Sequence, residues 1–386
     1  MIFTRVRTPR GPYFQPLVRK GAGLHEHTQQ EQPLSMRPFC KLADAGSYVA
    51  CRWDLAVDEE ARVYWIAFFK RHLEIILKLG QEAAARRGEP ADAQIRADRC
   101  RADFHAFFDS IPQRMHDGQR VTILTLDQWR DAILRRHGFV DAFIDLKNRE
   151  NEHMLPLLPE VCRQIDALRG ADQLLAVIEG VFAGNIFDMG AEATTRAFLG
   201  NSPDFFAVRR TLPRRPWLID DYDSLQCRLL EGHNHRKAVF FIDNAGSDFL
   251  LGALPMMRWL GRRGTRIVLA ANERPTLNDM TIYDVRAWWE RILAVEPSLK
   301  ELDIQRISTG TGEPLIDLSK VSDELNEASA DADLVILEGM GRGVESNLEA
   351  SFTCDALKLA MIKDALIARR LGGGVFDVVC RFSPGI

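Results

Sequence analysis

The stretch AVFFIDNAGSDFLLGALPMMRWLGRRGTRIVLAAN, residues 238–272, contains the change of rhythm that decides the fold. A short apolar run, Ala238–Asp243, is followed by a helical pattern over Asp248–Arg262 and by a second apolar run, Arg266–Asn272. Short runs rich in Val, Ile, Leu or Phe that alternate with helical patterns predict parallel strands joined by crossover helices. We therefore interpret this stretch as a β-α-β unit.

The same alternation continues toward the C-terminus. The further apolar runs are Asp303–Thr309, Leu334–Gly339 and Val375–Phe382, and the helical patterns between the runs are Ile282–Leu293, Val321–Ala330 and Ser351–Leu371. Strands that alternate with helices in this way build a sheet with helices on both faces. The sequence therefore predicts an α/β, Rossmann-like domain with a doubly wound, mainly parallel sheet.

The preceding part of the chain has a helical period instead. From Asp58 to about Gly200, apolar residues recur at three- and four-residue spacing, most clearly in Arg62–Leu79. Val121–Leu126 is compatible with a short strand, but the letters TLDQW favour the start of a helix. We predict an α-helical domain at residues 51–212, packed beside the α/β domain at 213–386, and a disordered or extended segment at residues 1–50.

Composition excludes several classes of protein. The 386 residues carry 50 Lys+Arg and 54 Asp+Glu, a net charge of −4, which argues against a general nucleic-acid binder. No apolar run approaches the ~18 uncharged residues of a membrane-spanning helix. The seven cysteines are scattered and form no CxxC pair, which fits a reducing, cytoplasmic location. The first residues are Arg-rich and acid-poor, so organellar targeting stays an alternative to a disordered tail.

Polar residues follow the first two predicted strands. Because ligands of open α/β sheets bind beyond the carboxyl ends of the strands, these residues are candidates for a site. Asp243 and Asn244 offer oxygens that suit Mg²⁺ or Mn²⁺, and Gly246 offers a backbone N–H that suits a phosphate. Asp279 follows the second strand and would complete a metal set. The alternative is that Asp243 or Ser247, and likewise Asp279, only caps a helix.

Three further groups are less specific candidates. Arg342 lies in the glycine-rich loop GMGRGV and suits a phosphate, or a solvated turn. Asn185 and Asp188, three residues apart, share a helical face amid apolar neighbours, which favours a structural hydrogen-bonded pair. Lys363 falls in a predicted apolar helix, Leu357–Ala368, where a lysine is usually solvated. No GxxxxGK[ST], HExxH or GxSxG motif occurs, so P-loop, zinc-protease and serine-hydrolase interpretations are unsupported.

The chain resembles the "domain of unknown function 89" family of metal-dependent damage-control phosphatases. The resemblance rests on five separated motifs in order, from about Phe182 to Lys363: FAGNIFDMG, RPWLIDD, VFFIDNAGSDFLLGALPMMRWLGRRGTRIVLAANERPTLND, DADLVILEGMGRG and DALKLAMIK. The letters EGMGR, Glu338–Arg342, are the signature of the branch that includes the phosphatase domain fused to an animal pantothenate kinase and stand-alone plant proteins. Residues 1–50 have no evident counterpart.

The resemblance implies a divalent metal, usually Mn²⁺, Ni²⁺, Co²⁺ or Mg²⁺, held by Asp243, Asn244 and Asp279. It also implies that Asn185 and Asp188 line the same cleft. The implied activity is hydrolysis of phosphomonoesters of small metabolites, with 4′-phosphopantetheine and its oxidised or otherwise damaged forms favoured for this branch. The expected partner is therefore a small phosphate ester, not a nucleic acid or a membrane, and a homo-oligomer stays open.

The implied mechanism follows from the negative charges of the phosphate and of the cleft that binds it. A cation orients the phosphate dianion in a carboxylate-rich cleft, while Arg342, Lys363 and N–H groups near Gly246 hold its other oxygens. The nucleophile is either metal-activated water or the carboxylate of Asp243.

Asp188 or Glu338 is the candidate general acid or base of that mechanism. Two rivals from other classes remain. One is a Rossmann-like methyltransferase that binds S-adenosylmethionine, although the first predicted strand ends in Asp-Asn rather than in a GxGxG loop. The other is a non-catalytic metabolite sensor that keeps the cleft without turnover.

Overall fold

The computed structural model describes residues 35–188, 204–232 and 234–386, and Ser35–Ile386 form one compact unit. The expectations for residues 1–34, disorder or targeting, lie outside the described residues. Residues 36–50 instead pack on the rest of this unit: strand β1, Met36–Arg37, pairs with β6, Val321–Ser322, and Phe39 is buried. Among the described helices, none has the length and apolar character needed to cross a membrane.

A seven-stranded sheet forms the centre, in the order β2-β9-β8-β7-β3-β4-β5. The strands are β2 (Ile219–Asp220), β3 (Lys237–Phe241), β4 (Arg266–Ala271), β5 (Ile304–Ser308), β7 (Leu334–Glu338), β8 (Asp355–Met361) and β9 (Val378–Ser383). Every neighbouring pair is parallel except β8 and β9. The chain runs outward from β3 through β4 to β5 and returns to β7 on the other side of β3, so the topological switch point lies between β3 and β7. The predicted α/β fold with a mainly parallel sheet is confirmed.

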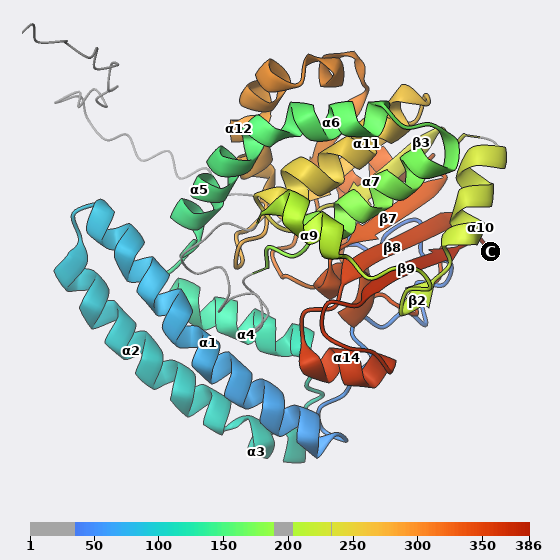
Figure 1. Ribbon diagram of the computed structural model, residues 1–386. Coiled ribbons are helices and arrows are strands. Elements are labelled where there is room, and N and C mark those ends of the chain that lie inside the picture. The colour runs from blue at the N-terminus through green and yellow to red at the C-terminus, as the bar shows by residue number, and fades with distance from the viewer. Residues whose placement is uncertain (1–34, 189–203, 233) are drawn as a thin grey trace, which may run out of the picture. The chain divides into compact units, whose positions relative to one another are not determined.

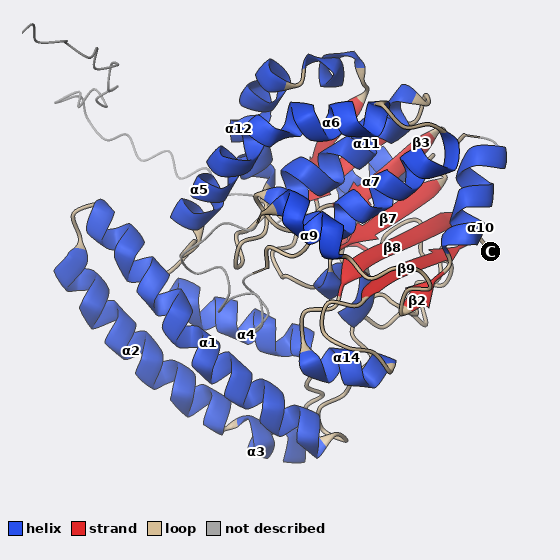
Figure 2. Cartoon of the chain, in the orientation of Figure 1, coloured by secondary structure: helices blue, strands red, loops and turns tan. Residues whose placement is uncertain are grey.

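Helices cover the sheet and extend beyond it (Figures 1 and 2). In this part of the chain they are α5 (Ile144–Met154), α6 (Leu158–Asp166), α7 (Gly170–Gly184), α9 (Phe205–Thr211), α10 (Tyr222–Gln226), α11 (Leu254–Arg262), α12 (Ile282–Val295) and α13 (Asp323–Ser329). Short turns of 3₁₀ or π type are η1 (Leu155–Leu157), η2 (Cys227–Glu231), η3 (Asp248–Ala253), η4 (Pro297–Glu301) and η5 (Met340–Glu345). The predicted helix Asp248–Arg262 is thus a π turn, η3, that continues into α11.

Alternate residues of the central strands serve different cores. In β3, Ala238 and Phe240 pack in the cluster that contains α7 and α11, whereas Val239 and Phe241 pack in a separate cluster. This alternation follows from the period of two along a strand. Because both faces are covered, the strand is a continuous apolar run in the sequence. The sequence therefore shows the strand clearly but not which residue faces which core.

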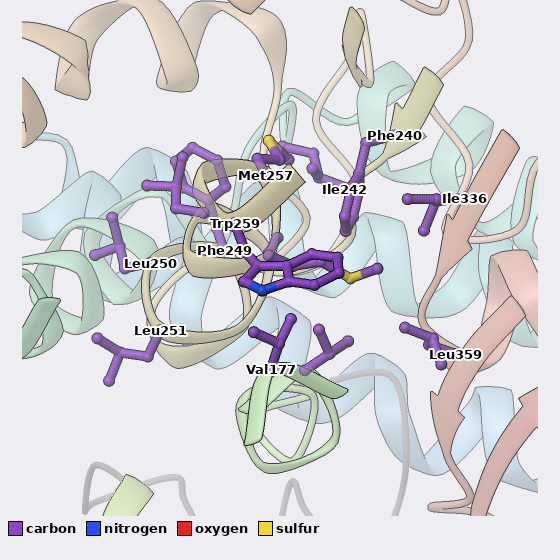
Figure 3. Packing of buried hydrophobic residues seen from close by; sticks show 14 of the residues in the cluster. Val177, Phe240, Ile242, Phe249, Leu250, Leu251, Met257, Trp259, Ile336 and Leu359 are labelled. Atoms are coloured by element: carbon purple, nitrogen blue, oxygen red, sulfur yellow. The ribbon is translucent and has the colours of Figure 1, made fainter. Parts of the chain in front are cut away.

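The larger core joins the sheet to the helices that follow and precede β3 (Figure 3). Phe249 and Met257 come from the η3–α11 segment, and Val177 comes from α7. Ile336 of β7 and Leu359 of β8 complete the contact from the sheet. Since α7 belongs to the predicted helical domain, its packing on the sheet ties that domain to the α/β part.

The four described helices that precede α5 form a group around a second core. They are α1 (Glu59–Arg86), α2 (Pro90–Asp109), α3 (Ile111–His116) and α4 (Ile123–Arg136). Thr122 caps α4 through a reciprocal capping box with Thr125, so the helical interpretation of Val121–Leu126 is confirmed. The domain boundaries at residues 50 and 212 stay predictions, since Ser35–Ile386 cluster as one unit.

The predicted helix Ser351–Leu371 is wrong. The segment contains β8, Asp355–Met361, and the short helix α14, Ala365–Leu371, whose N-cap is Asp364. Every residue of β8 is buried, and a strand buried on both faces has the same apolar letters as a buried helix. Lys363 therefore lies in the loop after a strand and not on a helix.

Lys358 in β8 predicts a pH dependence of stability. Its Nζ donates to the carbonyls of Leu348 and Ala350 at 2.8 and 2.7 Å, and burial lowers its pKa from 10.5 to about 8. Between these pH values the unfolded chain binds more protons than the folded one, so stability rises as pH increases and is lost as pH falls toward 8. Relative to Lys358→Met, the wild-type free energy of unfolding should rise by at most about 3 kcal/mol between pH 8 and 10.5, from about 1.36 kcal/mol per pKa unit. Urea denaturation at both pH values measures this change, and an unchanged difference between the wild type and Lys358→Met would contradict the lowered pKa of Lys358.

Candidate functional site

Polar side chains meet where the carboxyl ends of β3, β4 and β7 lie next to one another. Asp243 and Asn244 follow β3, and Asp279 lies in the connection after β4. The backbone of Asn244 bridges that of Asp279, and the Met280 N–H donates to the Asp243 carbonyl at 2.9 Å. All three side chains are buried. The structure thus brings together the three residues that the resemblance implied as metal ligands.

The guanidinium of Arg342 lies between the two carboxylates. It forms an ion pair with Asp243 Oδ1 and donates to Asp279 Oδ2 at 2.7 Å, and Arg342 is itself buried. Arg342 comes from η5, the π turn after β7, and Gly339 precedes that turn with φ +99°. Single π turns occur often at functional sites. The signature loop therefore holds both predicted metal-binding carboxylates in one arrangement.

Further buried polar groups form hydrogen bonds with Asp243 and Asn244. The Asp243 N–H donates to Glu338 Oε2 at 3.1 Å. Asp248 Oδ2 accepts from Asn185 Nδ2 at 2.8 Å and from Asn244 Nδ2 at 2.9 Å. Burial, with the nearby Asp248 carboxylate, raises the pKa of Glu338 well above its usual range and favours its neutral form. Glu338 therefore positions Asp243 rather than facing the cavity described below.

Lys363 joins the end of α7 to the sheet. Its fully buried Nζ donates to the carbonyl of Asn185 at 2.6 Å and to its Oδ1 at 3.0 Å, and it pairs with Asp188 Oδ2 at 2.8 Å. These acceptors match the three hydrogens of the ammonium group. The structure thus places Lys363 beside Asn185 and Asp188, with its donors directed to these residues rather than to a bound phosphate.

The backbone of Gly246 is also engaged within the protein. Its N–H donates to Asn151 Oδ1 at 2.7 Å, and its φ is +74°. A Cβ at this position would lie 2.9 Å from Cβ of Glu150, so only glycine fits between η3 and α5. The expected phosphate contact of this N–H is therefore not supported, and the residue serves the close packing of α5.

A cavity of about 40 Å³ lies beside Asp243, Asn244 and Asp279. Its polar lining residues are Asp127, Arg130, Asp188, Asp243, Asn244, Asp279 and Glu345, and its apolar lining includes Trp65, Phe68, Phe69, Ile123, Leu277 and Met340. We call this the acid cavity. Asp127 and Arg130 belong to α4, so the helical part of the chain supplies one wall and the sheet supplies the other.

Carboxyl groups outnumber cations around the acid cavity. Among the described residues at this site, the acids are Asp127, Asp188, Asp243, Asp248, Asp279, Glu338 and Glu345, and the cations are Arg130, Arg342 and Lys363. Burial raises the pKa of Asp279 to about 6 and that of Asp127 to about 7, although Arg342 and Arg130 act in the opposite direction. Even with Glu338 and Glu345 counted as neutral, five Asp carboxyl groups face three cations, and this imbalance favours binding of a further positive charge.

The donor set fits a hard divalent cation. Asp243 and Asp279 supply carboxylate oxygens, and Asn244, whose Nδ2 donates to Asp243 and Asp248, keeps its Oδ1 as a ligand atom. The described residues contain no cluster of three or more His, Cys, Asp or Glu side chains arranged to hold a metal. The candidate set therefore depends on the amide oxygen as well as on two carboxylates.

Sequence reasoning missed four residues of the site. The sequence pattern indicates Asp248 only as the start of a helix, and Glu345, just beyond the signature loop, belongs to no motif. Asp127 and Arg130 form a buried ion pair of 2.6 Å at i, i+3 on α4. Two opposite charges three residues apart on the apolar face of a helix are the signal that would have indicated them, because buried charges require partners.

The fold and this site define a class: a doubly wound α/β protein with a buried acidic site at its topological switch point, closed on one side by helices. The family model of the damage-control phosphatase ARMT1-like domain matches residues 75–379. The chain therefore belongs to this family, and the resemblance seen in the sequence is confirmed.

Relatives agree with this assignment. A damage-control phosphatase of Arabidopsis thaliana is 39% identical over 298 residues, covering 76% of this chain and 81% of the relative. The 4′-phosphopantetheine phosphatase of Mus musculus is 32% identical, covering 96% and 52%. Pantothenate kinase 2 of A. thaliana is 35% identical, covering 91% and 42%, so the chain spans about half or less of these last two proteins.

A solved structure shows the same fold. The crystal structure of a DUF89 family protein from Pyrococcus horikoshii superimposes with a TM-score of 0.57, at 18% sequence identity. The match covers 85% of this chain and 99% of that one. It supports the architecture described above.

The contact of Gly339 with Asp243 predicts that Gly339→Ala disrupts the site. A Cβ at Gly339 would lie 2.1 Å from Asp243 Oδ2, in addition to the strain of φ +99°. Gly264→Ala is the matched control, because Gly264 has φ +93° and a Cβ added there would meet no atom within 4 Å. The control should lose about 1 kcal/mol in urea denaturation, and Gly339→Ala at least about 2 kcal/mol more. Equal losses would contradict the close approach of the signature loop to Asp243.

Proposed function

We propose that the chain is a metal-dependent phosphatase that hydrolyses phosphomonoesters of small metabolites. The observation that carries the proposal is the buried excess of carboxyl groups at the switch point, where two carboxylates and an amide converge on one cavity. The favoured substrate is 4′-phosphopantetheine or one of its oxidised or otherwise damaged forms. The activity for which the mouse relative is named and the family membership of the chain support this choice.

Asp243, Asn244 and Asp279 would hold the cation, which is Mn²⁺, Ni²⁺, Co²⁺ or Mg²⁺. All three offer oxygen, the ligand type that hard divalent ions accept in proteins. When bound, such an ion supplies charge that neutralises a phosphate dianion and polarises its phosphoryl oxygen. Arg342 fixes the relative position of the two carboxylates through its paired contacts.

The remaining cavity residues divide the tasks of binding and proton transfer. Arg130 is the cationic side chain in the described lining of the acid cavity. It pairs with Asp127 and Asp131 of α4 and donates to Thr276 Oγ1, in the connection after β4, at 3.0 Å. It would bind the phosphoryl oxygens. Asp188, held by Lys363, would take a proton from the attacking water, and Asp243 is the alternative nucleophile. Glu338 and Lys363 act through these residues as positioning groups.

The charge and the size of the acid cavity limit the kind of ligand that it can bind. An acidic cavity of about 40 Å³ disfavours a polyanion such as nucleic acid, because the cavity is small and its carboxylates repel a phosphate backbone. We infer a small phosphate ester as the ligand. A cytoplasmic location and the oligomeric state stay predictions.

Loss of one metal-binding carboxylate should remove activity. We expect Asp243→Asn and Asp279→Asn each to lower Mn²⁺-dependent phosphate release from 4′-phosphopantetheine at least about 100-fold, because an amide cannot replace the charge that holds the cation. Asp303→Asn is the control, since Asp303 is exposed before β5. Circular dichroism should show that all variants are folded.

Other outcomes separate the alternatives. Retained activity in either variant would overturn the metal assignment. No phosphate release by the wild type with any of the four metals would overturn the phosphatase and leave the metabolite sensor. Calorimetric binding of S-adenosylmethionine at the same site would instead favour the methyltransferase.

A further inference from the structure

A second, larger pocket adjoins the acid cavity. It has a volume of about 210 Å³ and is formed by residues 48–53, the start of α4, the segment 344–350 and α14. Val49 on its wall is 41% exposed, so the pocket reaches solvent. We call it the alcohol pocket. None of the metal ligands proposed above lines it.

The two cavities share a wall. Ile123 and Glu345 line both the acid cavity and the alcohol pocket. The acid cavity has room for about three water-sized spheres, at about 10–15 Å³ each, which is too little for an extended alcohol. A longer substrate with its phosphate in the acid cavity must therefore place the rest of the molecule elsewhere, and the alcohol pocket lies on the other side of Ile123 and Glu345.

The lining of the alcohol pocket is apolar over most of its wall and carries a few polar groups. Leu348, Ile367 and Leu371 provide aliphatic surface. Trp53 provides an aromatic face, over which the Arg370 guanidinium lies 4.3 Å from the ring centroid. The Tyr48 hydroxyl on this wall donates to Asn347 Oδ1 at 2.7 Å. Such a surface suits an aliphatic chain interrupted by amide groups.

We propose that the alcohol pocket binds the alcohol part of the substrate, an elongated aliphatic chain with a few amide groups, while the phosphate occupies the acid cavity. This inference rests on the proposed function and adds where the substrate chain lies. Glu345, on the shared wall, is then next to the ester linkage. Burial raises the pKa of Glu345 well above its usual range, which weakens its repulsion of a phosphate.

Filling the pocket tests the inference. Leu371→Trp on α14 places a larger side chain on the wall of the alcohol pocket, far along the chain from the metal ligands. The measured quantity is the ratio of kcat/KM for 4′-phosphopantetheine to kcat/KM for glycerol phosphate, with Mn²⁺. We expect this ratio to fall at least tenfold in Leu371→Trp. In Arg369→Trp, the control on the same helix, the ratio should be unchanged, because exposed Arg369 does not line the pocket.

Direct binding gives a second readout that does not depend on turnover. Pantetheine, which lacks the phosphate, should bind the wild type in calorimetry without metal and should bind Leu371→Trp at least tenfold more weakly. If the wild type hydrolyses both esters but the ratio and pantetheine binding are unaffected by Leu371→Trp, the inference is wrong and the proposed function stands. If neither ester is hydrolysed while pantetheine still binds as expected, the phosphatase proposal fails and the pocket stands.

Discussion

The pairing of the Arg342 guanidinium with Asp243 and Asp279 is the interaction on which the site depends. Two carboxylates that follow neighbouring parallel strands would repel each other in a buried position, and desolvation would favour their neutral forms. A buried guanidinium offsets that repulsion and fixes the oxygens relative to one another. Because Arg342 enters through a π turn that begins after Gly339, the backbone of the signature loop determines the geometry of both acids.

The helical part of the chain completes this arrangement rather than only covering it. Arg130 of α4 donates to Thr276 Oγ1 in the connection after β4, and buried Lys147 joins Asp141 to Asp284 of α12 at 2.8 Å each. Breaking a buried pair by removing one partner leaves an uncompensated charge, which is strongly destabilising. These contacts therefore couple the position of α4 to the connection after β4, and that of α5 to α12.

The strands and helices around the switch point are predictable from the sequence, because they depend on local periodicity. The run 238–272 predicts the strands and helix around the switch point, and the rule that sites lie at the carboxyl ends of strands indicates Asp243, Asn244 and Asp279. The predictions that are wrong depend on tertiary burial. The strand β8 has the same apolar residues as a buried helix, so the sequence pattern predicts a helix at Lys363, where the structure has a loop. The N–H of Gly246 was expected to face a ligand, but Asn151, distant in sequence, accepts it. Contacts between segments so far apart in the chain leave no mark in the spacing of either one.

Anomalous scattering from a crystal grown with Mn²⁺ would locate the cation most directly. We predict one strong peak at the switch point, within about 2.0–2.4 Å of oxygens from Asp243, Asn244 and Asp279. Arg342 should remain beside that peak, in contact with at least one of the two carboxylates. A peak bound elsewhere, or these three side chains turned away from it, would contradict the metal site proposed for this chain.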